Sequence, residues 1–146
     1  MEIIEIIEKI VNIIQGIVII SATLFTSWWA YKTFAHKERI SELKKILNLV
    51  EIMYREGKKN VKAHDFDGAL RRIEIPVTLN ATILSSLYIE ERDRVEIFKL
   101  NSKFNHDYML LINEKNKKSI EERLSHFQLN YEKVSLKLFK ISKKYI

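Results

Sequence analysis

Histidine and aspartate side chains offer the clearest chance of chemistry in this sequence. The chain has four histidines, two of which directly precede an aspartate: His36, His126, and the pairs His64-Asp65 and His106-Asp107. Imidazole and carboxylate groups ligate divalent metals and act as general acids and bases. A hydrolytic metal site would therefore have to be built from these residues.

The order His36, His64-Asp65, Asp107 resembles that of the metal ligands in helical HD-type phosphohydrolases. The resemblance covers only these four residues, and it implies a bound divalent metal. It also places His36 directly beside an apolar N-terminal segment. The remainder of the chain is small for that fold, so the order of residues does not define a family.

No other enzyme motif is present. Helical ribonucleases of the HEPN type carry an Arg–His motif, but Arg123 and His126 stand too close together for it, and Arg55 and His64 too far apart. The three glycines are too scattered to form a phosphate-binding loop. The absence of cysteine excludes disulfides, thiolate metal sites and cysteine nucleophiles. We therefore predict a protein that is not an enzyme and that carries no cofactor or metal.

The elements that must position these residues fall into two unlike parts. A chain of 146 residues is long enough for one ordinary domain. Residues 1–31 carry three glutamates and one lysine, whereas residues 32–146 carry 24 Lys/Arg and 16 Asp/Glu. We expect residues 1–35 to form an N-terminal membrane anchor and residues 36–146 to form a cytoplasmic helical domain.

An uncharged run of 22 residues, 10–31, predicts a transmembrane helix. A helix of that length covers about 33 Å, and the hydrocarbon core of a bilayer is about 30 Å thick. The run ends in residues that favour the headgroup layer: Trp28, Trp29, Tyr31 and Lys32. Because more Lys and Arg follow the run than precede it, we expect a single-pass protein of the cell membrane with its N-terminus outside.

Small and polar residues gather on one face of the predicted anchor. At about 100° per residue they fall within an arc of roughly 140°, which only Ile19 interrupts. This small-polar face comprises Asn12, Gln15, Gly16, Ala22, Thr23, Thr26, Ser27 and Ala30. Small side chains let membrane helices approach, and polar ones can hydrogen-bond across the contact. The face predicts pairing with another copy or another membrane protein. The alternatives are hydroxyls bonded to their own backbone, or a pore wall with Glu5 and Glu8 at its mouth.

The rest of the chain reads as helices. Apolar residues of the last segment follow steps of 4 and 3, which is a heptad seam: Ile120, Leu124, Phe127, Tyr131, Val134, Leu138 and Ile141. We expect an earlier helix to continue from the anchor and end at Gly57, a linker over residues 57–68, and a break or kink at Pro76 with a new cap at Thr78. The predicted fold class is all-α: a single N-terminal transmembrane helix followed by a cytoplasmic bundle of three or four helices.

Lysines on the last helix form a basic face: Lys133, Lys137, Lys140 and Lys144. Such a face is typical of a solvated surface, but it would also suit the anionic lipid of an inner leaflet or the phosphates of nucleic acid. A separate acidic cluster near Asp93 is expected to be the solvated start of a helix. No zinc-finger spacing or RNA-binding aromatic motif accompanies the lysines. Nucleic acid is therefore the weakest of the partners considered.

Two functions of different classes remain open from the sequence. The first is a non-enzymatic, membrane-anchored scaffold that self-associates or holds a partner at the lipid bilayer. The second is an oligomeric pore-forming or membrane-disrupting effector, gated by its cytoplasmic domain. A membrane-tethered nucleic-acid binder is a weaker alternative.

Overall fold

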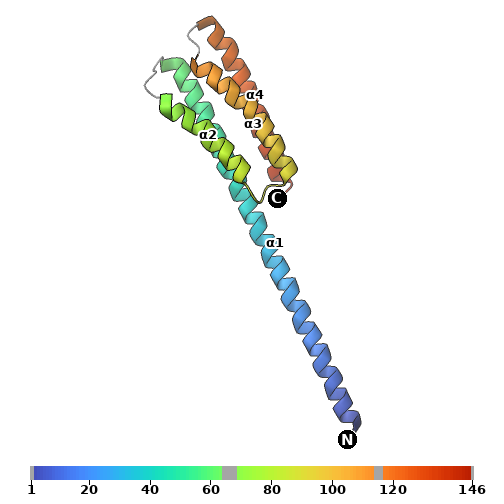
Figure 1. Ribbon diagram of the computed structural model, residues 1–146. Helices are drawn as coiled ribbons and strands as arrows, with labels where there is room; N and C mark the ends of the chain where they lie inside the picture. Colours follow the sequence, from blue (N-terminus) through green and yellow to red (C-terminus); the bar gives the residue numbers. More distant parts are fainter. Residues whose placement is uncertain (1, 64–68, 114–116, 146) are drawn as a thin grey trace. The chain divides into compact units, whose positions relative to one another are not determined.

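A computed structural model describes residues 2–63, 69–113 and 117–145. Within these ranges the protein is all α-helical and has no strand, as predicted (Figure 1). The four helices are α1 (Glu2–Ala63), α2 (Ala69–Ser85), α3 (Glu91–Asn113) and α4 (Lys117–Lys143). Most of the predicted linker after Gly57 falls outside the described residues or inside α1.

The chain divides into two units, residues 1–37 and residues 38–146. The expected boundary lay two residues earlier. Helix α1 runs without interruption from the first unit into the second, so the predicted anchor segment and the helix after it form one element. This continuity follows from the absence of proline and of any helix-breaking turn between them.

Gly57 does not end α1, which contradicts the prediction. The helix continues six residues further to Ala63, and Gly57 is buried inside it. A Cβ atom built on Gly57 would lie 2.6 Å from Cε1 of Phe127 and 3.5 Å from Cδ2 of Tyr108. The close approach of α1 to an aromatic ring of α4 therefore requires a glycine at this position. Gly57 is needed for packing between the helices and does not mark the end of α1.

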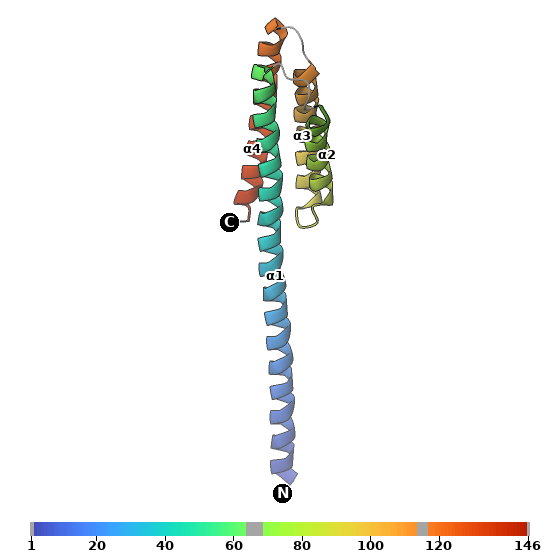
Figure 2. The same ribbon diagram turned by 90° about the vertical axis from the view of Figure 1, so that its left-hand side faces the viewer.

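The second unit is a bundle in which the later part of α1, α2, α3 and α4 lie side by side (Figures 1 and 2). Stacked aromatic rings join three of the helices, with Phe127 of α4 4.7 Å from Phe104 of α3 and 5.7 Å from Tyr54 of α1. Buried residues of all four helices, among them Ile46, Leu79 and Phe104, belong to one hydrophobic core. The bundle thus has four helices, the larger of the two numbers predicted.

Helix α2 passes through Pro76 instead of breaking there. Pro76 is buried, and Thr78 lies inside the helix, where its carbonyl accepts a hydrogen bond from the hydroxyl of Thr82 at 2.8 Å. The predicted cap at Thr78 is therefore wrong. Packing of Leu79 and Ile83 into the core stabilises a helix that the proline alone would weaken.

The predicted transmembrane helix is not supported. In the part of the chain that the structure describes, no helix combines the length and the apolarity needed to cross a lipid bilayer. The uncharged run in α1 is interrupted by polar side chains such as Asn12 and Gln15, which make it less apolar than its length suggests.

Candidate functional site

The most extensive candidate site is the apolar surface of α1 between Ile3 and Phe34. Eighteen large hydrophobic side chains of this segment are exposed, with exposed fractions from 45% at Val11 to 74% at Ile3. They cover most of the circumference of the helix, and the small-polar face occupies the remainder. Contiguous apolar surface of this extent marks a site of interaction with lipid or protein.

Aromatic rings gather near the end of this segment. Phe25 lies 6.1 Å from Trp28 and 6.4 Å from Trp29, measured between ring centroids. The ammonium of Lys32 lies 5.0 Å from the centre of the Trp28 ring. The structure therefore places Trp28 and Trp29 beside Phe25 and Lys32 over Trp28, while Tyr31, the fourth predicted interface residue, is exposed.

The small-polar face is partly satisfied by its own helix. The hydroxyl of Thr23 donates to the carbonyl of Ile19 at 2.8 Å, and that of Thr26 donates to the carbonyl of Ala22 at 2.8 Å. Such bonds to the preceding turn were one of the alternatives to a helix partner. No hydrogen bond joins the side-chain amides of Asn12 or Gln15 to any described residue. Together with the hydroxyl of Ser27, these two amides are the polar groups of the face that have no hydrogen-bond partner among the described residues.

The residues of the heptad seam lie along the inner side of α4. Five of them are buried in the core of the bundle, and Leu124 and Tyr131 are partly buried against it. The rings of Tyr131 and Tyr54 stack at 4.0 Å, which places the seam against α1 as well as α3.

The basic face of α4 is divided by ion pairs to α3. Lys144 lies 2.8 Å from the carboxylate of Asp93, and Lys137 lies 3.6 Å from it. Lys137 also contacts Glu96 at 2.5 Å. Asp93 is buried, which contradicts the expectation of a solvated helix start. Its position one turn before Ile97, on the core stripe of α3, was the signal in the sequence.

The C-terminal residues complete a polar network at this end of the bundle. The guanidinium of Arg39 lies 4.0 Å from the centre of the Tyr145 ring, and its Nε donates to the carbonyl of Tyr88 at 2.6 Å. The hydroxyl of Tyr145 donates to Glu90 at 3.0 Å. Glu42 of α1 accepts from the backbone N–H of Leu87 at 3.0 Å and of Tyr88 at 3.1 Å. The start of the bundle, the α2–α3 connection and the C-terminus are thus tied together.

The pKa values of two side chains in this network, Lys144 and Tyr145, are shifted from their ordinary values. The hydrogen bond to Asp93 raises the pKa of Lys144 above its usual 10.5. Burial, together with the hydrogen bond to Glu90, raises the pKa of Tyr145 above its usual 10.0. Both shifts favour the protonated side chains in the folded protein.

Three asparagines form a polar cluster between α2 and α3 that the sequence reasoning missed. The carbonyl oxygen of Asn80 accepts hydrogen bonds from the amides of Asn101 at 2.8 Å and Asn105 at 3.1 Å. The carbonyl oxygens of Asn101 and Asn105 are buried and have no hydrogen-bond partner among the described residues. Because a buried polar group favours arrangements in which it finds a partner, the cluster selects one register of α2 on α3.

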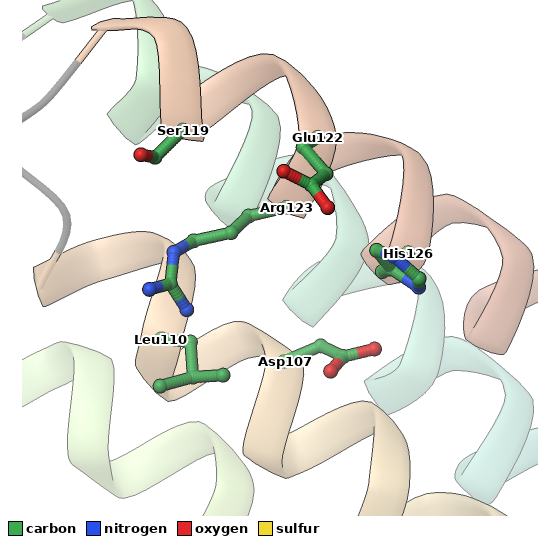
Figure 3. Close-up of a pocket in the computed structure, with 6 residues that line it drawn as sticks. All are labelled: Asp107, Leu110, Ser119, Glu122, Arg123 and His126. Atoms are coloured by element: carbon green, nitrogen blue, oxygen red, sulfur yellow. The ribbon is translucent and has the colours of Figure 1, made fainter.

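A surface pocket of about 290 Å³ lies between α3 and α4 (Figure 3). It brings His126 together with Asp107, one of the residues in the HD-type order, and Arg123 reaches across it toward Leu110. Asp107 already accepts a hydrogen bond from the amide of Asn130 at 2.6 Å. Three further residues contribute to the lining: Leu110, Ser119 and Glu122.

The pocket does not assemble the HD-type ligand set. His36 belongs to the first unit, and His64 and Asp65 lie outside the described residues. Across the described ranges, no group of three or more His, Cys, Asp or Glu side chains is placed to hold a metal ion.

Comparison with known proteins adds no relative. No protein-family model, no curated protein and no solved structure matches the chain.

Proposed function

We propose that this protein is a non-enzymatic, membrane-associated scaffold, whose apolar α1 segment lies in lipid and whose helical bundle serves as an interaction module. The observation that carries the proposal is the exposure of large apolar side chains around most of the circumference of α1 between Ile3 and Phe34, outside the small-polar face. Water is a poor solvent for such a surface, since transfer of apolar area out of water stabilises at about 25 cal/mol per Å². A single partner helix would cover only part of this apolar surface, whereas lipid covers all of it.

Self-association would give the polar residues of the segment hydrogen-bond partners inside the bilayer. A single copy carries Asn12 and Gln15 on an otherwise apolar rod, and polar groups are costly in hydrocarbon without a hydrogen-bond partner. When two or more copies turn their small-polar faces toward one another, these amides bond across the contact. The surface that remains toward lipid consists mostly of Ile, Val, Leu and aromatic side chains.

Vesicle flotation tests the proposal. Full-length protein is expected to float with phosphatidylcholine vesicles and to resist extraction by alkaline carbonate. Replacing Ile14 and Val18 by lysine should abolish flotation, because each lysine opposes insertion by about 2.5–3.5 kcal/mol at the centre of a bilayer. The matched control replaces Leu129 and Leu136, two exposed apolar residues of α4, by lysine as well. This variant should float like the wild type. Wild-type protein that stays at the bottom of the gradient would refute the proposal.

A pore-forming effector is the second candidate. It is favoured by the polar face itself, because Glu5 and Glu8 continue the arc that holds Asn12 and Gln15. In an oligomer this arc would line a channel with acidic rings. Conductance across planar bilayers separates the two functions, since a scaffold leaves the membrane sealed.

A further inference from the structure

An apolar groove lies on the surface of the bundle between α1 and α4. Its volume is about 240 Å³, and its floor is formed by Leu43 and Leu138, which belong to the hydrophobic core. The other residues that line it are Ile40, Lys44, Leu47, Ser135, Phe139 and Ser142. All of them lie in the second unit, so the groove is independent of the apolar segment at the start of α1.

The charged groups at the groove are few and of one sign. Lys44 is exposed at its edge, and no aspartate or glutamate lines it. Lys143 stands beside it, with its ammonium 4.7 Å from the centre of the exposed Phe139 ring. The groove therefore combines a hydrocarbon surface with a positive rim.

A hydroxyl group inside the groove also needs a partner. The Oγ atom of Ser135 is buried and has no hydrogen-bond partner among the described residues. Ser142, in contrast, donates to the carbonyl of Phe139 at 2.8 Å. A buried hydroxyl without a partner is destabilising, so a ligand acceptor in the groove would favour rotation of the Ser135 side chain toward it.

We propose that this groove binds a single-chain anionic amphiphile, a long-chain fatty acid. The chain lies along Ile40, Leu43 and Leu138, and the carboxylate meets the ammonium of Lys44 and, once the Ser135 side chain has rotated about χ1, its hydroxyl. Sites for whole drug-sized ligands have volumes of about 300–1,000 Å³, so this smaller groove suits one narrow chain. The positive rim selects an anionic ligand over a neutral one.

Photo-crosslinking tests the assignment on the full-length protein, kept in a fluorinated surfactant that competes poorly with hydrocarbon chains. The probe is a palmitate analogue with a diazirine at its methyl end, and labelled peptides are located by mass spectrometry. We expect labels within residues 40–47 and 135–142. Unlabelled palmitate should prevent labelling at lower concentrations than methyl palmitate, which lacks the charge.

Two adjacent lysines provide a matched pair of variants. Lys44 lines the groove, whereas Lys45 is also exposed but does not line it. Lys44→Gln should raise the palmitate concentration needed for half-maximal competition about two- to fivefold, the range typical of an exposed ion pair. Lys45→Gln should leave it unchanged.

Three results would overturn the assignment. Labels confined to residues 3–34 would show that the probe does not bind in the groove. Equal competition by palmitate and its methyl ester would show that the groove does not recognise the carboxylate. Labelling that falls as the protein concentration rises would show that a second copy covers the groove. Stronger competition by phosphatidylglycerol than by palmitate would assign it to a phospholipid. None of these results depends on whether the protein floats with vesicles, so this proposal and the membrane proposal fail separately.

Discussion

Close packing at Gly57 makes a strong prediction at the level of a single residue. The ring of Phe127 is confined by Phe104, Tyr54 and Tyr108, so it has little room to move away from an added Cβ. Gly57→Ala gains about 1 kcal/mol of helix propensity but forces overpacking that typically costs about 1–3 kcal/mol. We expect a net loss in the free energy of unfolding, measured by urea denaturation.

The same substitution in a Phe127→Leu background provides the control. With the ring gone, the new methyl group has space, and Gly57→Ala should become neutral or stabilising. A stabilising effect of Gly57→Ala in the wild-type background would contradict the close contact, because it would mean that the ring moves aside freely.

The C-terminal network predicts a loss of stability at high pH. Folding raises the pKa of both Lys144 and Tyr145, so their contribution is complete below their ordinary pKa values of 10.5 and 10.0 and is lost as the pH rises through the higher folded values. The difference in unfolding free energy between wild type and a Lys144→Gln/Tyr145→Phe variant should stay constant between about pH 7 and 9 and shrink above about pH 10.

An exposed lysine near the C-terminal end of α4 serves as the control for this measurement. Lys140 makes no ion pair with any described residue, so Lys140→Gln should differ from wild type by the same amount at every pH. A wild-type advantage over Lys144→Gln/Tyr145→Phe that survives unchanged to about pH 11 would show that the two protonated groups do not stabilise the fold.

For the helices, the spacing of apolar residues predicted correctly which side chains are buried. Single glycine and proline residues were poorer predictors of where a helix ends. The steps of 4 and 3 along α4 place Phe127, Val134 and Ile141 in the core, because burial on one side of a helix requires that spacing. The end of α1 and the course of α2 were predicted wrongly. Gly57 and Pro76 are weak helix formers, but contacts with other helices decide whether a helix passes through them, and those contacts are not visible in one segment.

The burial of polar residues in the interior of the bundle was also not predicted from the sequence. Asp93 and Asn101 share the apolar stripe of α3 with Ile97, yet their residue types suggested solvent. Their burial depends on partners that lie far away in the sequence, Lys144 for Asp93 and Asn80 for Asn101. A pattern within a single helix does not supply such partners.

Helix α1 carries a prediction about self-association. Since Thr23 and Thr26 bond their own backbone, the amides of Asn12 and Gln15 should dominate any contact between copies. Asn12→Leu/Gln15→Leu should reduce crosslinked oligomers in mild detergent, with a loss of roughly 0.6–2 kcal/mol for each hydrogen bond. Thr23→Val/Thr26→Val, which leaves the amides in place, should change crosslinking little. Equal crosslinking of the two double variants would contradict the proposal that copies associate through the amides of Asn12 and Gln15.

At the scale of the whole molecule, the four-helix topology brings the C-terminus back to the start of the bundle. The contact of Tyr145 with Arg39 places the two ends of residues 38–146 together. Because Lys137 and Lys144 are paired with α3, only Lys133 and Lys140 of the predicted basic face remain without ion pairs to described residues. Any attraction to anionic lipid therefore depends on fewer charges than the sequence suggests.

Under the membrane proposal, the distribution of charge along the chain predicts how the protein is oriented across the bilayer. Positive residues that follow the apolar segment, beginning with Lys32 and Lys37, outnumber the single Lys9 before it, and this bias favours the cytoplasm for residues 38–146. Protease added to sealed inside-out vesicles should digest the bundle, whereas protease added to intact cells should leave it whole. The reverse pattern would exclude this orientation.

Exchanging the charges tests whether they cause the orientation. A variant that combines Glu5→Lys and Glu8→Lys with Lys32→Glu and Lys37→Glu moves the positive excess to the other flank. We expect a mixed population, in which part of the bundle becomes accessible to protease outside the cell, because the Lys/Arg bias then opposes the original arrangement. Unchanged protection would mean that folding of the bundle, rather than charge, keeps residues 38–146 on one side.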